Sequence, residues 1–307
     1  MRQGVLVMAY GTPRRLEDVG AYYTHIRRGS PPPAPLLLEL VERYRTVGGP
    51  TRLNLITREQ AAGLERALAG RGFDVPVRVG FKHVEPFIGE VVRQMAADGI
   101  ERAVGLVMAP HYSLRSIAEY EGYARQAAPN GMAVETIRSW HDDRGLVEFL
   151  ADRLRAALDR AGGDRHVVFT AHSVPARVLD GDDPYPRQLR TTCELVAEAA
   201  GVDRWSFAYQ SAGRTAEPWM GPDVLEVIGE LAESGETGLV VQSIGFVADH
   251  LEILYDLDVE ARRAAERRGL SFARTDMPNA HPDFVAALAD LVAGRLAAPA
   301  RGASGAL

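Results

Sequence analysis

Short apolar runs alternate with longer stretches of mixed apolar and polar residues along most of the chain. The short runs are rich in Val, Ile and aromatic residues, which favours β-strands. The predicted strands lie at 4–10, 75–81, 103–110, 132–139, 166–173, 205–211 and 238–246. In the longer stretches, for example 85–99 and 221–235, apolar residues recur with a period near 3.6, which is typical of helices. Strands that alternate with helices in this way indicate an α/β protein with parallel sheets.

A weak internal repeat predicts that the chain has two similar halves. The strand at 5–10 ends in MAYGTP and the strand at 166–172 ends in TAHSVP, so that Tyr10 and His172 take equivalent places. In α/β proteins, ligands bind beyond the carboxyl ends of the parallel strands. Loops from two such sheets can therefore face each other, and we predict two α/β domains with the active site in the interdomain cleft.

Turn signals predict where these domains begin and end. AGGDR at 161–165 separates the two halves, and GSPPPAP at 29–35 excludes a helix or a central strand. A helical stretch follows these prolines and ends at Gly48 and Gly49, where it would form a lid over the cleft. The predicted limits are 1–162 for an N-terminal domain with an inserted helical lid segment at about 29–56, 163–280 for a C-terminal domain, 281–298 for a helix that packs back on the first domain, and 299–307 for a disordered tail.

Composition and charge exclude several classes of protein. The chain has 307 residues, a formal net charge of -6 and no basic run, which argues against a nucleic-acid partner. No apolar run is long enough to span a membrane and no signal-peptide pattern is present, so we expect a cytoplasmic protein without a membrane anchor. The single cysteine, Cys193, excludes an internal disulfide and a cysteine cage for an iron–sulfur cluster.

The stretch GFVADHLEILYDLDVE at 245–260 places Glu252, Asp256 and Glu260 at successive four-residue spacing. Carboxylates one helical turn apart repel each other mildly, so local helix energetics disfavour such a line. One interpretation is the solvated face of an amphipathic helix, with Leu251 and Leu254 on the packed side. The other is a path for cations or protons, which the position directly after a buried strand favours. The pattern alone leaves both open.

His172 follows a buried strand, where catalytic groups gather in this class of fold, although a lone histidine is more often structural. Together with Glu252 at an equivalent strand end it suits two tasks, which are binding a divalent first-row metal and acting as base and proton relay. One His and one Glu are too few for a tight structural site, so they predict a weak, open one. No GxGxxG, GxxxxGK[ST], HExxH or GxSxG motif occurs, so nucleotide and hydrolase functions lack their sequence signatures.

A set of motifs resembles the ferrochelatase family, specifically its coproporphyrin-dependent type. The motifs are LVMAYGTP, YYTHIRRG, RYRTVGG, GFKHVEPFI, VMAPHYS, TAHSVP, DDPYP, EPWMGPDV and GFVADHLEILYD, and they span nearly the whole chain. The resemblance implies two Rossmann-like domains with a porphyrin in the cleft, and insertion of Fe2+ into coproporphyrin III during haem biosynthesis. It also implies a monomer that contacts other haem-pathway enzymes transiently, with iron as a substrate and no permanently bound cofactor.

The resemblance assigns roles to particular residues. It implies His172 and Glu252 as the inner pair for iron insertion, with Tyr10 on the opposite face of the macrocycle as axial ligand to the product iron. Asp256 and Glu260 then form a possible secondary cation path. The implied contacts to propionates and to the porphyrin ring are Arg27, Arg43, Tyr44, Thr51 and Tyr120. Without the resemblance, Arg27 would be a solvated surface residue, and Tyr10 could equally be a ligand or an aromatic residue at a strand end that packs on the core.

The expected chemistry follows from the substrate. Coproporphyrin carries four negatively charged propionates, and Arg27 and Arg43 could bind them although the protein as a whole is acidic. Two pyrrole protons must leave while Fe2+ sheds water, and we expect a neutral His172 to accept a proton while Glu252 steers iron or relays protons. Three alternatives remain, which are a protoporphyrin IX ferrochelatase, a cobalt or nickel tetrapyrrole chelatase, and a non-catalytic haem carrier.

Overall fold

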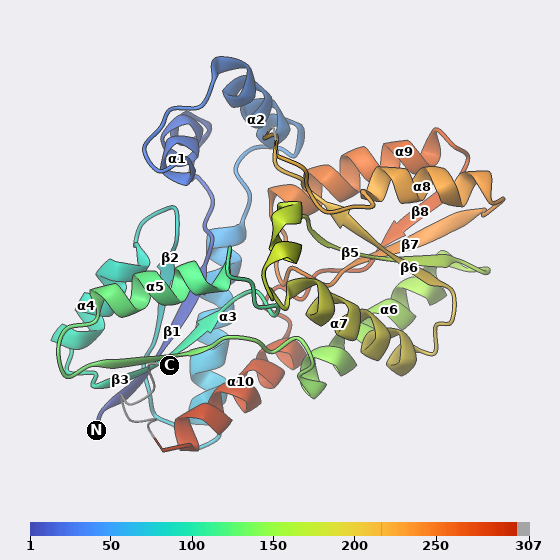
Figure 1. Cartoon of the computed structure of the whole chain (residues 1–307). Coiled ribbons are helices and arrows are strands. Elements are labelled where there is room, and N and C mark those ends of the chain that lie inside the picture. Colours follow the sequence, from blue (N-terminus) through green and yellow to red (C-terminus); the bar gives the residue numbers. More distant parts are fainter. Residues whose placement is uncertain (216, 300–307) are drawn as a thin grey trace.

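The computed structural model describes residues 1–215 and 217–299, with backbone only for 179 and 180. The predicted tail at 299–307 lies outside the described residues from 300 onward. Two four-stranded parallel sheets dominate the fold (Figure 1). The first has the order β2-β1-β3-β4 and the second β6-β5-β7-β8. The strands are β1 Gln3–Ala9, β2 Val77–Phe81, β3 Arg102–Val107, β4 Ala133–Ile137, β5 His166–His172, β6 Trp205–Gln210, β7 Gly238–Ser243 and β8 Ser271–Arg274.

Helices cover both faces of each sheet (Figure 1). Their bounds are η1 Leu16–Asp18, α1 Val19–Ile26, α2 Ala34–Thr46, α3 Leu53–Ala69, α4 Ile88–Ala97, α5 Ile117–Ala127, α6 Arg144–Ala161, η2 Ala176–Asp180, α7 Tyr185–Ala200, α8 Val224–Glu233, η3 Glu252–Ala261, α9 Arg262–Glu266 and α10 Pro282–Ala297. Local chemistry explains several ends. Asp223 caps α8 by accepting from the Leu225 amide, and Gly201 ends α7 in the left-handed conformation. The predicted α/β class with two parallel sheets is confirmed.

One strand was not predicted from the hydrophobic pattern. β8 has the sequence SFAR and lies at the edge of the second sheet, paired with β7 only. Edge strands are buried on fewer sides than central strands, so they need no continuous apolar run. Its last residue, Arg274, instead binds Asp258 through two hydrogen bonds of 2.8 Å, which ties this edge to η3.

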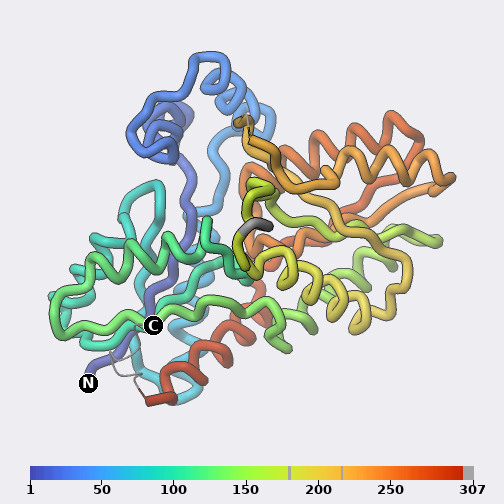
Figure 2. The backbone as a smooth tube through the Cα atoms, in the orientation of Figure 1, coloured from blue at the N-terminus to red at the C-terminus, as the bar shows by residue number. Residues whose placement is uncertain are grey.

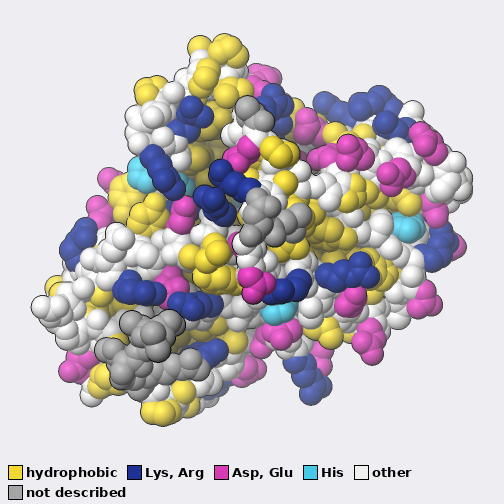
Figure 3. All heavy atoms as spheres, in the orientation of Figure 1, with side chains coloured by type: hydrophobic (Ala, Val, Ile, Leu, Met, Phe, Trp, Pro, Cys, Tyr) yellow, Lys and Arg dark blue, Asp and Glu magenta, His cyan; other side chains and the backbone are white. Residues whose placement is uncertain are grey.

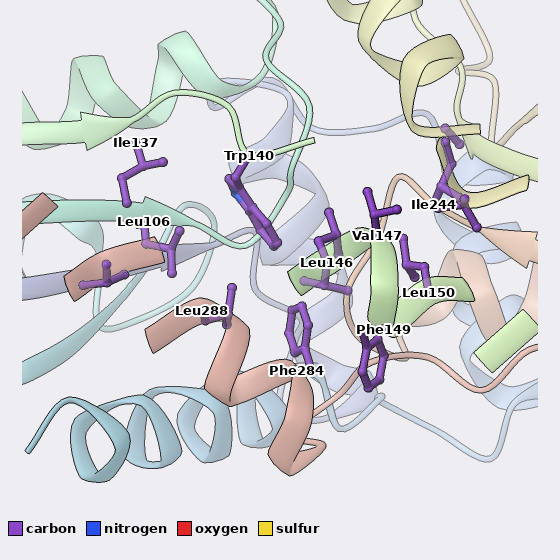
Figure 4. Packing of buried hydrophobic residues seen from close by; sticks show 14 of the residues in the cluster. Leu106, Ile137, Trp140, Leu146, Val147, Phe149, Leu150, Ile244, Phe284 and Leu288 are labelled. Atoms are coloured by element: carbon purple, nitrogen blue, oxygen red, sulfur yellow. The ribbon is translucent and has the colours of Figure 1, made fainter. Parts of the chain in front are cut away.

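The two sheets share one apolar core beneath the cleft. A single cluster of buried residues contains Val5 and Leu106 from the first sheet and Phe169 from the second. Trp140 and Phe284 lie inside this cluster, with ring centroids 6.2 Å apart, and the side chains of α6 and α10 fill the space between the halves (Figure 4). The sheets are therefore held together by packing as well as by the connecting chain.

Helix α10 lies across the bottom of the molecule and contacts α3, which covers the first sheet, and α6, which packs against the second sheet (Figure 1). Arg71, in the turn after α3, binds Asp290 at 2.6 Å, and Phe149 on α6 packs against Phe284 with ring centroids 5.7 Å apart. The predicted boundary at 162/163 falls in the turn between α6 and β5. The division into domains at the limits given above remains our proposal.

Helices α1 and α2 form a separate projection above the first sheet (Figure 2). We call these two helices, residues 19–46, the lid helices. The predicted lid segment at 29–56 contains α2, and α1 packs beside α2 although it precedes that segment. Among the described residues, no helix is both long enough and apolar enough to cross a membrane.

Candidate active site

A cavity of about 740 Å3 lies between the carboxyl ends of the two sheets and beneath the lid helices. Residues that follow β1, β3, β5, β6 and β7 line it, together with residues of α1, α2 and η3. A second hollow, of about 940 Å3, lies at the amino end of β1 around Met1 and Arg78. No histidine lines that second hollow, and the polar groups of the two halves do not converge there. The interdomain cavity is therefore the candidate active site.

His172 and Glu252 meet in this cavity. The Nε2 atom of His172, the last residue of β5, lies 3.4 Å from Oε1 of Glu252, the first residue of η3. About a third of each side chain is exposed, 35% and 34%, and this exposure faces the cavity, so a ligand can reach both. Gln210 donates from Nε2 to the Glu252 carbonyl oxygen at 2.9 Å and so holds the start of η3 against β6.

A second histidine, His250, approaches the same carboxylate from the other side. Its Nε2 atom lies 3.5 Å from Oε2 of Glu252, while its Nδ1 donates to the Ala248 carbonyl at 2.9 Å. The Nδ1 of His172 likewise donates to the carbonyl of Ser173. Because a carbonyl can only accept, these two bonds fix both rings so that each Nε2 faces Glu252. One carboxylate thus lies between two imidazoles.

This arrangement changes the protonation of the pair. Burial by itself would lower the pKa of His172, but the Glu252 carboxylate and the Ser173 carbonyl outweigh it and raise that pKa to about 9. Burial would raise the pKa of Glu252, yet the two histidines hold it well below its usual range. At neutral pH the ligand-free pair is therefore an imidazolium and a carboxylate. The expectation of a neutral His172 is wrong for the ligand-free protein. The sequence does not show that the Glu252 carboxylate faces the imidazole ring and raises its pKa.

The acidic segment after β7 is a π-helix, Glu252–Ala261, and not the ordinary amphipathic helix that the pattern suggested. Its hydrogen bonds join residues five apart and its turns are wider, so residues four apart still lie near one side. Glu252, Asp256 and Glu260 all line the cavity. Asp256 is 5% exposed, so the interpretation of this line as a solvated face is wrong at its central member.

Arg43 of lid helix α2 reaches across the cavity to this line of acids. Its guanidinium lies 3.2 Å from Asp256, 3.9 Å from Glu260 and 3.4 Å from Glu39, and 4.8 Å from the centre of the Tyr255 ring. Burial and the nearby Glu252 carboxylate raise the pKa of Asp256 to about 7, and the hydrogen bond from Ser211 and the charge of Arg43 offset this only in part. Arg43 therefore ties the lid helices to η3 in the ligand-free protein.

Tyr10 lies on the opposite wall, directly after β1. Its ring is 40% exposed, and this exposure too faces the cavity. The ring contacts His83 with centroids 4.4 Å apart, and Lys82 places Nζ 5.7 Å from its centre. Burial of the phenol in the cleft, together with the Glu252 and Glu119 carboxylates, raises its pKa well above the usual range. The free protein therefore holds Tyr10 as a neutral phenol.

The remaining predicted residues divide into two groups. Tyr44 and Tyr120 line the cavity, with the Tyr44 hydroxyl 3.1 Å from Thr12 Oγ1 and the Lys82 ammonium 5.2 Å from the centre of the Tyr120 ring. Thr51 lies behind this wall and donates to Thr12 Oγ1 at 3.4 Å. Arg27 is exposed at the end of α1 and lies 6.0 Å from the Tyr23 ring, outside the lining. Sequence reasoning assigned no role in the site to His250 or Lys82.

Signals for both missed residues were present. His250 lies two residues before Glu252 in the same short loop, and Lys82 directly follows the end of β2, the neighbour of β1. No group of three or more His, Cys, Asp or Glu that could hold a metal ion occurs within residues 1–215 and 217–299. Cys193 is buried in the shared core on α7 and takes no part in it.

Comparison with known proteins identifies the family. The family model named Ferrochelatase matches residues 2–296. The chain belongs to the ferrochelatase family. A protein of Geobacillus sp. (strain WCH70) named coproporphyrin III ferrochelatase is 43% identical over 96% of this chain and 98% of its own length. A protein of Bacillus subtilis (strain 168) with the same name is 40% identical over 96% of this chain and 98% of its own length.

Solved structures of more distant chelatases share the fold. SirB from Bacillus subtilis with Fe3+ superposes with a TM-score of 0.61 at 14% identity, covering 97% of this chain and 96% of that one. CbiX, described as the terminal enzyme of sirohaem biosynthesis in denitrifying bacteria, has a TM-score of 0.56 at 13% identity, covering 96% of this chain and all 100% of its own. At such identities the likeness supports the two-sheet fold alone. With its family known, this chain is a metal-insertion enzyme, and Fe2+ is a substrate.

The raised pKa of Asp256 predicts how stability depends on pH. A carboxyl that binds its proton more tightly in the folded state than in the unfolded state stabilises the fold below its ordinary pKa and loses this contribution as pH rises through about 7. Asp256→Asn stays neutral, so its free energy of unfolding relative to wild type should rise by about 1 to 3 kcal/mol between pH 4 and pH 8. Urea unfolding without metal or porphyrin measures this.

Glu42→Gln, at an exposed position on α2, is the control. The difference between its free energy of unfolding and that of wild type should stay constant over the same pH range. A pH-independent difference for Asp256→Asn would show that Arg43 keeps this carboxylate ionised throughout.

Proposed function

We propose that this protein inserts Fe2+ into coproporphyrin III to give iron coproporphyrin III, and that it does so as a cytoplasmic monomer. The main observation in support is that His172 and Glu252 form a pair on one wall of the cavity, while Tyr10 lies on the opposite wall. Support comes also from relatives named coproporphyrin III ferrochelatase that match nearly the full length. A planar macrocycle between these walls would offer one face to the acid–histidine group and the other to the phenol.

The groups around Glu252 suit the removal of two pyrrole protons. Glu252 is ionised and faces the cavity, so it can accept a proton or attract Fe2+. His172 holds a proton in the free protein, and an approaching dication would favour its loss by Coulomb repulsion. His250, fixed by Ala248, can take over a proton from the same carboxylate. We propose that Glu252 receives protons from the porphyrin and that His172 and His250 set its charge.

The line from Glu252 to Glu260 gives a route by which a cation could arrive. Glu260 is 39% exposed, Asp256 lies behind it, and Glu252 faces the cavity. Divalent first-row metals bind carboxylate oxygens, and a set of single carboxylates passes them on without trapping them. Arg43 occupies the same carboxylates in the free protein, so we propose that it leaves them when the cation or the porphyrin enters.

The predicted contacts to the porphyrin are retained as part of the proposal. Tyr44 and Tyr120 present phenol groups in the cavity wall, and Thr51 supports Tyr44 through Thr12. Arg27 stands at the end of α1, next to lining residues Tyr23 and Ile26, where a propionate that projects from the cavity would meet it. We further propose transient contact with other haem-pathway enzymes for transfer of the product.

The function is tested by anaerobic incubation of the protein with Fe2+ and either coproporphyrin III or protoporphyrin IX. Insertion is followed by loss of porphyrin fluorescence, and we expect turnover with coproporphyrin III. If neither porphyrin is metallated, the proposed function is wrong. If only protoporphyrin IX is metallated, the family is right but the proposed substrate is wrong.

His172→Ala should abolish insertion while leaving porphyrin binding within about threefold of wild type. The imidazole acts when protons leave and iron enters, and loss of such a group typically costs about a hundredfold or more in rate. Single-turnover fluorescence and a porphyrin titration without iron separate the two effects. His281→Ala, at the start of α10 and outside the cavity lining, is the control and should behave as wild type. Turnover near normal in His172→Ala would remove this residue from the mechanism.

Asp256→Asn combined with Glu260→Gln should raise the KM for Fe2+ about tenfold and leave the affinity for porphyrin unchanged. The two neutral side chains keep their shape but no longer attract a dication. The double variant Glu230→Gln with Glu233→Gln on α8 removes the same charge far from the cavity and serves as control. Unaltered iron saturation in the first double variant would mean that Glu252 receives iron from another direction.

A further inference from the structure

The basic side chains that line the cavity differ in whether a carboxylate already neutralises them. They are Arg43, Lys82, Arg115 and Arg214. Arg43 binds Asp256 at 3.2 Å, Lys82 binds Glu119 at 2.7 Å, and Arg214 binds Glu39. Arg115 has no carboxylate within ion-pair distance among the side chains that the structure describes, and its own side chain is exposed. It is thus the lining cation whose charge is available to a ligand.

The backbone that carries Arg115 is firmly held. Asp183, before α7, accepts hydrogen bonds at 3.0 Å from both the Ser113 hydroxyl and the Leu114 amide through Oδ2. The Arg115 amide in turn donates to the Ser113 hydroxyl oxygen at 3.1 Å. These bonds fasten the loop between β3 and α5 to the second half of the molecule. The side chain therefore projects from a fixed point of the backbone, so that ligand binding must order the side chain alone and not the loop.

The surroundings of Arg115 carry a small excess of positive charge, because the cations Arg28, Lys82 and Arg115 outnumber the carboxylates of Glu119 and Asp183. Glu119, near the start of α5, binds both Lys82 at 2.7 Å and Arg28, two residues after the end of α1, at 3.3 Å. One carboxylate thus serves two cations, and Arg115 lies four residues before it with none. On the space-filling view, Lys and Arg side chains gather in the hollow below the lid helices (Figure 3). We call the lining residues Lys82 and Arg115, together with Glu119 and Arg28, which join Lys82 through ion pairs and lie outside the lining, the basic corner.

The opposite side of the cavity has the reverse balance. There Glu39, Asp256 and Glu260 surround Arg43, and Arg214 is the second cation. A polyanionic ligand would meet repulsion from the carboxylates at η3 and attraction at the basic corner. Its acidic groups are therefore directed toward α5, where Arg115 offers a planar guanidinium that matches a carboxylate in two hydrogen bonds.

We propose that Arg115 binds a carboxylate of the porphyrin substrate at the basic corner. This inference rests on the proposed function, in which the substrate carries one propionate on each pyrrole ring, so that a carboxylate faces this corner in every orientation of the ring. Arg115 acts on the bound substrate as a whole and takes no part in proton or iron transfer. It is a substrate-binding residue additional to Arg27 and Arg43.

The test compares Arg115→Gln with Arg115→Lys and with Arg125→Gln as a matched control. Arg125 lies at the far end of α5, binds Glu121 and is outside the lining, so its replacement changes net charge equally. For Arg115→Gln we expect the KM for coproporphyrin III to rise about five- to tenfold with kcat within about twofold. The dissociation constant without iron, from fluorescence titration, should rise by the same factor. Arg115→Lys should retain most of the affinity.

Ionic strength provides a readout that a purely structural role would not change. Salt screens exposed charges, so the ratio of affinities between wild type and Arg115→Gln should shrink as salt rises from about 0.05 M to about 0.5 M. The inference is overturned if Arg115→Gln binds coproporphyrin III as wild type does, if Arg125→Gln weakens binding equally, or if only kcat falls. Failure of wild type to metallate coproporphyrin III would instead refute the proposed function, and the iron-free titration would still decide on Arg115.

Discussion

A carboxylate between two imidazoles is the interaction on which the rest of this site depends. Glu252 lies within 3.5 Å of Nε2 of both His172 and His250, and each ring is oriented by a backbone carbonyl that accepts from its Nδ1. Withdrawal of a charge from water is costly unless opposite charge and hydrogen bonds surround it. The two histidines supply both, and they keep an ionised carboxylate directed into a cavity that a substrate can enter.

The orientation of this group depends in turn on the apolar core below it. His172 ends a strand whose Phe169 belongs to the core cluster shared by both sheets, and Trp140 and Phe284 close that cluster from the other side. Because the interior is tightly packed, the ends of β5 and β7 cannot shift independently of β1 and β3. The core below the site is thus rigid, whereas the lid helices above it contact η3 mainly through the ion pairs of Arg43.

Charge is distributed unevenly around the cavity, and this asymmetry relates the two substrates to each other. Acids gather along η3, where a dication would arrive. Basic side chains outnumber acids at the basic corner, where the carboxylates of a porphyrin would lie. A cation and a polyanion that approach from the same side would neutralise each other before the reaction. The cavity has a volume of about 740 Å3, and its acidic and basic groups lie on different sides. This separation allows a cation and a polyanion to be bound at the same time.

Much of this arrangement was determined by the sequence alone. Alternating strand and helix patterns predicted the parallel sheets, and the matching strand ends placed Tyr10 and His172 at the cleft. Such patterns act over neighbouring residues, so a single chain is enough to show them. The same strand-end argument paired His172 with Glu252, the family motifs assigned this pair to iron insertion, and comparison with relatives confirmed the family. β8 escaped prediction because a short edge strand needs no apolar run.

Other features were decided only by the tertiary structure. Arg43 and Asp256 are 213 residues apart in sequence, so the ion pair that restrains the lid helices could not be inferred from local spacing. The same is true of the burial of Asp256 and of the protonated state of His172, because pKa values depend on every charge and on the solvent around a group. Whether a basic residue is already neutralised, as Lys82 is and Arg115 is not among the described residues, likewise depends on which distant carboxylate the fold brings near it.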